Sequence, residues 1–211
     1  MDIKKFIQLR RYLYHLTDPI NCESIFNDYK LKSFVTLAGI FDIPNAQEVL
    51  RKQRIGHRQP VHSKGNYKFT PRDQDPLERS WVPLVLEDGM TKEDFIYDIN
   101  SRVFFWAKET DLVTHYKRYK KLGHKPFVLR VATEDLFNLN SLPPMFCHLN
   151  SGAPSHWTHG LPARGKSTFQ LADYYLKSPS SVREVTFKDQ CVLPKNIYYK
   201  KEITESFRKL K

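Results

Sequence analysis

Residues 12–33 read YLYHLTDPINCESIFNDYKLKS, and this stretch decides how the fold begins. The apolar, aromatic run Tyr12–Tyr14 predicts a strand that ends on His15. Asp18 and Pro19 predict a helix start directly afterwards, because aspartate caps a first turn and proline suits the first helical position. A histidine between a strand and a returning helix either holds a ligand or makes a local hydrogen bond, and this stretch alone leaves both open.

The composition is that of a folded and strongly basic protein. The 211 residues are 40% hydrophobic and 13% aromatic, which predicts one domain over residues 1–211 with a proper core. Thirty-four Lys and Arg residues against 23 Asp and Glu residues leave a net charge of +11. Such an excess favours a polyanionic partner such as nucleic acid, the alternative being a basic protein without one.

The sequence also bears on compartment. Three widely spaced cysteines predict no disulfide framework. The first residues lack the apolar core of a signal peptide, and no apolar run approaches the ~18 residues that a membrane-spanning helix needs. We therefore expect a cytoplasmic protein with no membrane partner.

Short strand and helix patterns alternate with long polar segments along the rest of the chain. Strands are expected at 102–107, 127–131 and 182–187, and helices at 1–11, 45–54, 91–100 and 111–123. The apolar segment 34–41 fits either a helix or a strand, and the terminal residues 200–211 fit a charged helix or tail. Long loops are expected at 56–67 and 138–165. Without a βαβ rhythm or a GxGxxG motif, the order of elements predicts a mixed α+β domain and disfavours a Rossmann sheet.

Two motif matches are interpreted as coincidental. Gly160–Ser167 satisfies the phosphate-binding loop pattern GxxxxGK[ST], but no strand pattern precedes it and too little chain follows for the rest of such a fold. Cys147, His148, His156 and His159 include two types of zinc ligand, but no second pair stands at ligand spacing, so no metal site is expected.

Glu184 is a stronger candidate. Alternation along the strand 182–187 places Val182, Glu184 and Thr186 on one face. A carboxylate among apolar neighbours is costly unless it is solvated, paired or employed in chemistry. The alternative is an edge-strand glutamate paired with a nearby basic residue.

The order of these blocks resembles the ADP-ribosyltransferase superfamily. The strings YHLT and NCESI resemble the opening of the DNA-thymidine ADP-ribosyltransferase toxins, and VREVTF followed by VLPKNI resembles their glutamate strand. Phe105-Trp106-Ala107 resembles the middle strand of poly-ADP-ribose polymerases, and Tyr116 falls where those enzymes place a second aromatic. RDQDPL, RVFFW and NSGAP also resemble an uncharacterised bacterial family. Phe105 stands where a tyrosine is usual, and 138–165 has no counterpart.

The resemblance implies a split antiparallel sheet core with peripheral helices and long loops. It also implies roles at the ribose–nicotinamide bond of NAD, whose cleavage passes through an oxocarbenium-like cation. Glu184 would hold a ribose hydroxyl, stabilise that cation and serve as base for the acceptor. His15 would anchor a ribose hydroxyl, and the backbone at Leu16 and Thr17 would read the nicotinamide amide.

Further roles follow for aromatic and basic residues. Phe105 and Tyr116 would sandwich the nicotinamide ring, because flat aromatic faces stack. Arg72 would bind the pyrophosphate of NAD through its planar guanidinium. Five basic residues would bring a nucleic-acid acceptor to the site: Arg51, Arg54, Arg58, Lys117 and Lys120.

The resulting hypothesis is an NAD-dependent ADP-ribosyltransferase that modifies a DNA or RNA base. NAD is its co-substrate, and no metal is required. Such an enzyme would be a toxin or defence effector with an antitoxin or reversing hydrolase as partner. Three alternatives stay open: a protein-modifying relative, an RNA 2′-phosphotransferase-like enzyme, and a non-catalytic nucleic-acid-binding module on the same fold.

Overall fold

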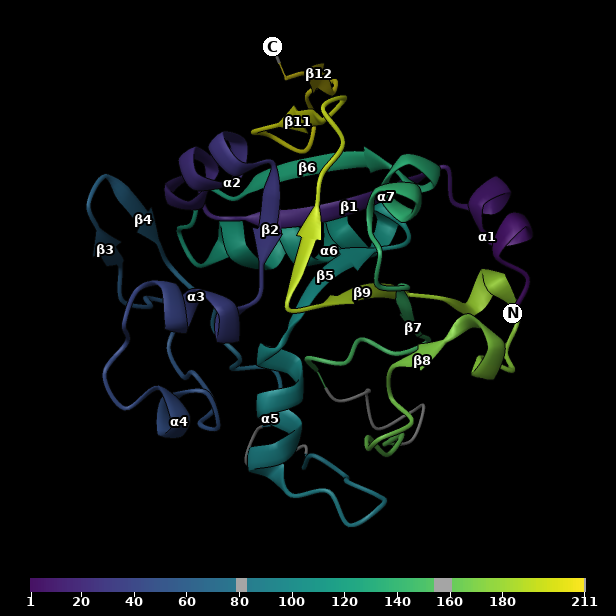
Figure 1. Cartoon of the computed structure of the whole chain (residues 1–211), viewed down its shortest axis with the longest axis horizontal. Coiled ribbons are helices and arrows are strands. Elements are labelled where there is room, and N and C mark those ends of the chain that lie inside the picture. Colours follow the sequence, from purple (N-terminus) through teal and green to yellow (C-terminus); the bar gives the residue numbers. More distant parts are fainter. Residues whose placement is uncertain (79–82, 154–160, 211) are drawn as a thin grey trace.

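An eight-stranded antiparallel sheet in the order β12-β11-β6-β1-β5-β9-β7-β8 forms the centre of the molecule (Figure 1). The computed structural model describes residues 1–78, 83–153 and 161–210. The strands of the sheet are β1 Tyr12–Thr17, β5 Arg102–Trp106, β6 Phe127–Ala132, β7 Met145–Cys147, β8 Gln170–Leu171, β9 Glu184–Lys188, β11 Tyr198–Lys200 and β12 Arg208–Lys209. Two small sheets pair β2 Lys30–Lys32 with β10 Gln190–Val192, and β3 His62–Lys64 with β4 Tyr67–Phe69.

Helices surround this sheet, so the expected α+β class is confirmed. The α-helices are α1 Ile3–Leu9, α2 Cys22–Asp28, α3 Phe34–Ile40, α4 Ala46–Val49, α5 Lys92–Asn100, α6 Glu109–Lys121 and α7 Thr133–Leu139. The short 3-10 helices are η1 Pro19–Asn21, η3 Ala172–Tyr174 and η4 Pro179–Ser181. Within the described residues, no helix has both the length and the apolar character needed to cross a membrane.

The opening stretch forms the predicted strand and helix, but β1 continues past His15 to Thr17. The Asp18 side chain accepts a hydrogen bond from the backbone N–H of Ile20 at 3.0 Å, and Pro19 begins η1. The helical segment continues through α2 and ends at Tyr29, which has a φ of 49°. This left-handed residue turns the chain back into β2.

The central sheet splits between β1 and β5. β1 pairs with β6 at six positions and β5 pairs with β9 at five, but β1 meets β5 only at Tyr14, opposite Trp106. Beyond this pair the second half of β1 and the first half of β5 do not pair with each other. Two half-sheets therefore diverge from one shared position.

Alternation along β5 and β9 assigns their side chains to two faces. Phe105, Val185 and Phe187 are fully buried or nearly so in the main hydrophobic core, which α1, α2 and α7 cover. Trp106 lies directly opposite Glu184, so these two side chains share the other face. The helix α6 packs on that side of β1 and β6, behind the sheet in Figure 1.

Four expectations about elements were wrong. The loop expected at 56–67 contains part of the β3–β4 hairpin, and the loop expected at 138–165 contains β7, which extends the sheet. The helix expected at 45–54 ends at Val49. The described residues of 200–211 form turns and β12 in place of a helix. The four strands missed in these segments, β3, β4, β7 and β12, have three residues or fewer, so no periodicity marks them.

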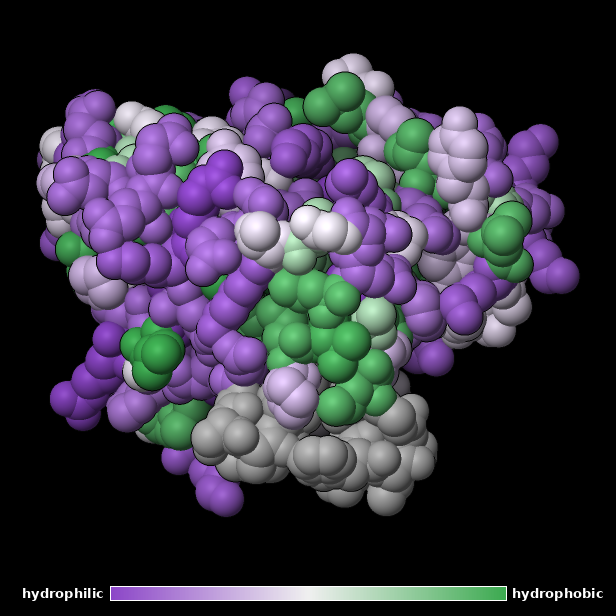
Figure 2. Space-filling view, turned by 90° about the horizontal axis from the view of Figure 1, so that it is seen from below, coloured by the Kyte–Doolittle hydropathy of each residue, from purple (hydrophilic) through white to green (hydrophobic). Residues whose placement is uncertain are grey.

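One face of the molecule combines hydrophilic and apolar character. Figure 2, viewed from below Figure 1, shows mostly hydrophilic residues, with one large apolar area below the middle and several smaller ones around it. Exposed large apolar side chains are otherwise scattered over the described surface, as is usual for folded proteins.

Candidate active site

A cavity of about 520 Å³ opens at the split in the sheet. It is lined by six of the residues to which the sequence assigns roles at NAD: His15, Leu16, Thr17, Arg72, Phe105 and Glu184. β1 and β9 are separated only by β5, and Tyr14, Trp106 and Glu184 lie opposite one another across these three strands. The backbone of Tyr14, the residue before His15, therefore lies two strand spacings, roughly 10 Å, from that of Glu184. The fold thus brings together the two residues on which the sequence hypothesis depends.

Glu184 begins β9 and is only 4% exposed. Its Oε2 accepts a hydrogen bond from the backbone N–H of Ser151 at 3.1 Å. Burial raises the pKa of Glu184 to about 7, although the Ser151 contacts and the positive charge of Arg183 oppose this rise. A carboxyl with a pKa near neutrality exchanges a proton readily at physiological pH, which suits a general base or a cation stabiliser.

His15 lies in the gap where β1 and β5 diverge. Its Nδ1 is 2.8 Å from the backbone carbonyl oxygen of Phe104. Because a carbonyl oxygen only accepts, Nδ1 donates, and Nε2 is then the acceptor of the neutral ring. Burial lowers the pKa of His15 to about 4, with a smaller contribution from the positive charge of Arg72. His15 is therefore an uncharged acceptor suited to a hydroxyl group.

Arg72 is the least satisfied cation of the cavity. Its guanidinium lies over the Tyr119 ring, 4.1 Å from the ring centroid. Its Nε and Nη2 are buried and have no hydrogen-bond partner among the described residues. The next residue, Asp73, is instead ion-paired with Arg118 at 2.9 Å. Arg72 is thus positioned to bind an anion that enters the cavity.

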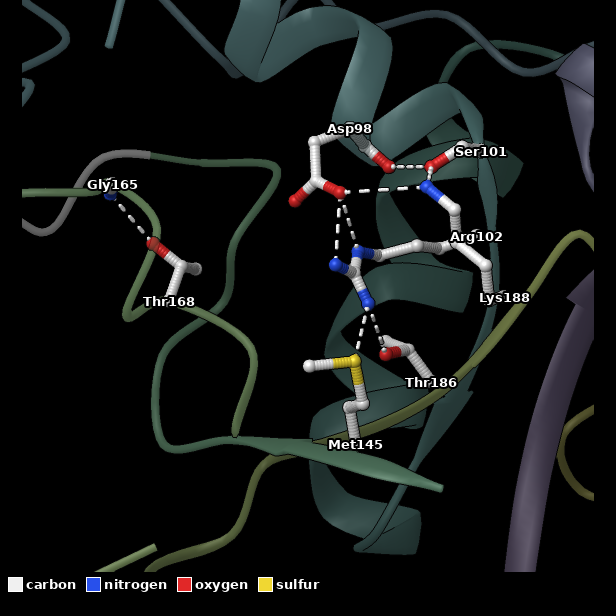
Figure 3. A network of polar contacts seen from close by, with 8 residues as sticks. All are labelled: Asp98, Ser101, Arg102, Met145, Gly165, Thr168, Thr186 and Lys188. Carbon is white, nitrogen blue, oxygen red and sulfur yellow. Dashed lines mark hydrogen bonds and ion pairs between the residues drawn. The ribbon is translucent and has the colours of Figure 1, made fainter. Parts of the chain in front are cut away.

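Arg102, in contrast, is held by protein groups (Figure 3). Its guanidinium donates to Oδ1 of Asp98 at 2.8 and 3.1 Å, and its Nη1 lies 3.0 Å from Sδ of Met145 and 3.5 Å from Oγ1 of Thr186. Lys188 approaches the same aspartate at 3.9 Å. This network braces β5, β7 and β9 on the face that carries Glu184.

The segment 150–153, which contacts Glu184, is held by Arg164. The Arg164 side chain is 1% exposed and donates to four backbone carbonyl groups, those of Asn150, Ser151, Ala153 and Pro162. Gly165 lies so close to Glu87 that an added Cβ would be 2.7 Å from its Cγ. Arg164 therefore positions the backbone N–H of Ser151, which donates a hydrogen bond to Glu184. The string NSGAP marks this segment in the sequence, but no pattern there predicts the role of Arg164.

The stacking roles expected of Phe105 and Tyr116 do not fit this geometry. Phe105 borders the cavity, but its ring is 0% exposed and packs against Phe187 with centroids 5.9 Å apart, so no face remains for a ligand. Tyr116 is outside the cavity lining, with its hydroxyl 3.0 Å from the carbonyl of Lys201. Trp106 and Tyr119, one residue and about one helical turn further along, line the cavity instead.

The basic residues expected to bind nucleic acid are mostly outside the cavity. Arg54 lines it and donates to the carbonyl of Arg72 and to Oδ1 of Asn100, both at 2.7 Å, and burial lowers the pKa of Arg54 to about 10. The other four lie on the outer surface: Arg51, Arg58, Lys117 and Lys120. Arg51 and Lys120 are ion-paired there with carboxylates.

The two motif matches lie partly outside the described residues. Gly160 lies outside the described residues, and Ser167 is followed by turns and β8, without the helix that a phosphate-binding loop needs. His156 and His159 also lie outside them. Within the described part of the chain, no three His, Cys, Asp or Glu side chains could hold a metal ion, and Cys22, Cys147 and Cys191 are free thiols.

The fold and cavity define an α+β protein whose split antiparallel sheet holds a buried carboxyl and a neutral histidine in one cleft. Residues 11–196 match a family of unknown function, DUF7002, and the chain belongs to that family. No curated protein and no solved structure matched the chain.

Proposed function

We propose that the protein is an NAD-dependent ADP-ribosyltransferase that modifies nucleic acid. One observation carries the proposal: His15 and Glu184, from opposite ends of the chain, line one cavity on either side of the split in the sheet. The split-sheet order of the described strands agrees with the ADP-ribosyltransferase-like core that the sequence suggests. The unpartnered Arg72 supports a ligand with negative charge, as a dinucleotide has.

The chemistry follows from the protonation states of these groups. In the transfer, the bond between C1′ of the ribose and the nicotinamide nitrogen breaks, and its electron pair leaves with nicotinamide. Ionised Glu184 stabilises the positive charge that develops on the ribose. Neutral His15 accepts a hydrogen bond from a ribose hydroxyl through Nε2, while the backbone of Leu16 and Thr17 faces the nicotinamide end. A nitrogen or oxygen of the acceptor then bonds to C1′ and gives up its proton to Glu184.

Aromatic packing around the nicotinamide is reassigned in this proposal. Trp106 shares the face of Glu184 by register, and its ring lies 5.1 Å from that of His115, centroid to centroid. Both rings line the cavity. Trp106 takes the stacking role that the sequence had suggested for Phe105.

Nucleic acid is the proposed acceptor because of charge. The net charge of +11 attracts phosphate backbones, and Arg58 and Lys117 offer cations on the outer surface. Modification of nucleic acid would make the protein a toxin or defence effector. Its partners would then include an antitoxin or a hydrolase that removes the ADP-ribose.

The test is label transfer from NAD. The protein is incubated separately with pools of DNA, RNA and protein and with NAD labelled in its adenosine half, and nicotinamide release is measured in parallel. We expect label in a nucleic-acid pool, complete loss of it in Glu184→Gln, and no loss in Glu23→Gln, which alters an exposed glutamate of α2.

Other outcomes separate the alternatives. Label in the protein pool alone would favour a protein-modifying enzyme, and transfer to a 2′-phosphorylated RNA alone would favour the phosphotransferase-like reaction. Salt-dependent nucleic-acid binding without any NAD consumption would favour the non-catalytic module. The last result would refute the transferase proposal.

A further inference from the structure

A second cavity of about 170 Å³ adjoins the first. The two cavities share a wall that contains Arg72, Asp73 and Tyr119. The shared wall is thus a place where a ligand of the first cavity continues into the second.

Unpartnered buried polar atoms gather at this wall. Eight buried side-chain nitrogen or oxygen atoms have no hydrogen-bond partner among the described residues, and five of them belong to four neighbouring residues. These are Nε and Nη2 of Arg72, Oδ2 of Asp73, Nη1 of Arg118 and Nε2 of His124. Buried polar groups are normally paired, so this concentration indicates a surface that a ligand completes.

The chemistry of these atoms specifies the ligand. The guanidinium nitrogens of Arg72 and Arg118 are donors only, which fits phosphate oxygens. Asp73 forms an ion pair with Arg118 through Oδ1 at 2.9 Å, so its side chain is a carboxylate. The other oxygen, Oδ2, can therefore only accept a hydrogen bond. A bare phosphate would satisfy the donors and leave the aspartate oxygen unpaired. A ligand with both a phosphate and a neighbouring hydroxyl satisfies both.

We propose that the wall shared by the two cavities is a ribose-phosphate subsite. Arg72 and Arg118 bind phosphate oxygens, and Asp73 accepts a hydrogen bond from a ribose hydroxyl. The Tyr119 ring supports the Arg72 guanidinium from one side. The proposal rests on the proposed function for its identification of the first cavity as the site of the reacting ribose, and it adds the part of the nucleotide that lies beyond it.

The charged residues that line the second cavity are compatible with binding of an anion there. Arg58, His57 and His124 line it, and the rings of His57 and His124 lie 5.9 Å apart, centroid to centroid. Its second carboxylate, Asp18, already accepts the N–H of Ile20. The ribose phosphate has two sources in the proposed reaction, the adenosine half of NAD and a nucleotide of the acceptor.

The experiment measures binding of ADP by titration calorimetry. ADP carries both groups, 2′,3′-dideoxy-ADP lacks the hydroxyls, and pyrophosphate lacks the ribose. The variants are Arg72→Gln and Asp73→Asn. Arg51→Gln is the matched control, because Arg51 also lies over a tyrosine ring, at 4.8 Å from the Tyr97 centroid, and pairs with a carboxylate, but lines neither cavity.

We expect Arg72→Gln to weaken ADP binding at least about tenfold, equivalent to 1.4 kcal/mol, and Arg51→Gln to leave it unchanged. In the unmodified protein, dideoxy-ADP should bind several-fold more weakly than ADP, and this difference should vanish in Asp73→Asn. The comparison of ligands needs no variant, so it stands even if a variant fails to fold. Equal binding of ADP, dideoxy-ADP and pyrophosphate would overturn the subsite, as would ADP affinity that Arg72→Gln leaves unchanged.

Competition identifies the source. Displacement of ADP by NAD assigns the subsite to the dinucleotide, and displacement by a 5′-phosphorylated oligonucleotide but not by NAD assigns it to the acceptor. If the protein consumes NAD but binds ADP, dideoxy-ADP and pyrophosphate equally well, the subsite is refuted and the transferase proposal stands. Ligand differences without NAD turnover would support the subsite and refute the transferase.

Discussion

Replacement of Glu184 by glutamine should abolish transfer and, at the same time, stabilise the fold at alkaline pH. Glutamine keeps the size of the side chain and an oxygen that can accept the hydrogen bond from the Ser151 N–H. In the unmodified protein this hydrogen bond to Glu184 is 3.1 Å long. It removes the negative charge, which burial disfavours. A purely structural glutamate that relied on its charge would behave in the opposite way.

The pKa of Glu184 sets the magnitude. Burial raises this pKa from its ordinary value of 4.5 to about 7. Each pKa unit is worth about 1.4 kcal/mol, so the ionised side chain lowers the free energy of unfolding by about 3 kcal/mol. Between pH 4.5 and about 7 the unfolded chain loses its proton first, so stability falls as the pH rises through this window. The loss of stability caused by ionised Glu184 is absent below that pH window and complete above it.

Urea and thermal unfolding at pH 5 and pH 8 check this reasoning. At pH 8, Glu184→Gln should be more stable than the unmodified protein by about 3 kcal/mol, or roughly 6–12 °C in Tm for a chain of this size. At pH 5 most of the difference should disappear, and Glu23→Gln should show no such dependence. Equal or lower stability of Glu184→Gln at pH 8 would refute a buried carboxylate kept at a cost to stability.

Three further predictions concern single residues. Phe105→Ala should lower the free energy of unfolding by about 3–5 kcal/mol. Trp106→Ala should chiefly weaken NAD binding in a calorimetric titration. The reverse pattern would assign the stacking role to Phe105. Gly165→Ala should cost about 1–3 kcal/mol in urea unfolding because its Cβ would clash with Glu87, and an unchanged midpoint would contradict that contact. The pKa of His15, lowered to about 4, should make stability fall as pH drops from 6.5 towards 4, and His15→Asn should lose this part of the pH dependence in acid unfolding.

The sequence predicted the site residues of the first and last strands, His15 and Glu184, better than those of the middle strand. His15 and Glu184 stand out because a polar group interrupts an apolar strand. The middle strand RVFFW has large apolar side chains on both faces, so alternation could not show whether Phe105 or Trp106 faces the ligand. A shift of one residue along a strand moves a side chain to the opposite face, and that is the size of the error. Arg164 stands in the sequence only within a motif match, and its role could not be predicted because its partners are backbone carbonyls of another loop.

The sequence by itself determined several local elements and the charge. The cap at Asp18, the strand pattern before Lys188 and the net charge of +11 depend only on neighbouring residues or on composition, so they could be predicted. Only the tertiary structure decided where β1 separates from β5 and which polar atoms face the resulting cavity. Strand pairing depends on backbone hydrogen bonds between distant segments, and backbone groups are the same in every residue type. The unpartnered atoms of Arg72 and Asp73 likewise exist only because distant elements bury them together.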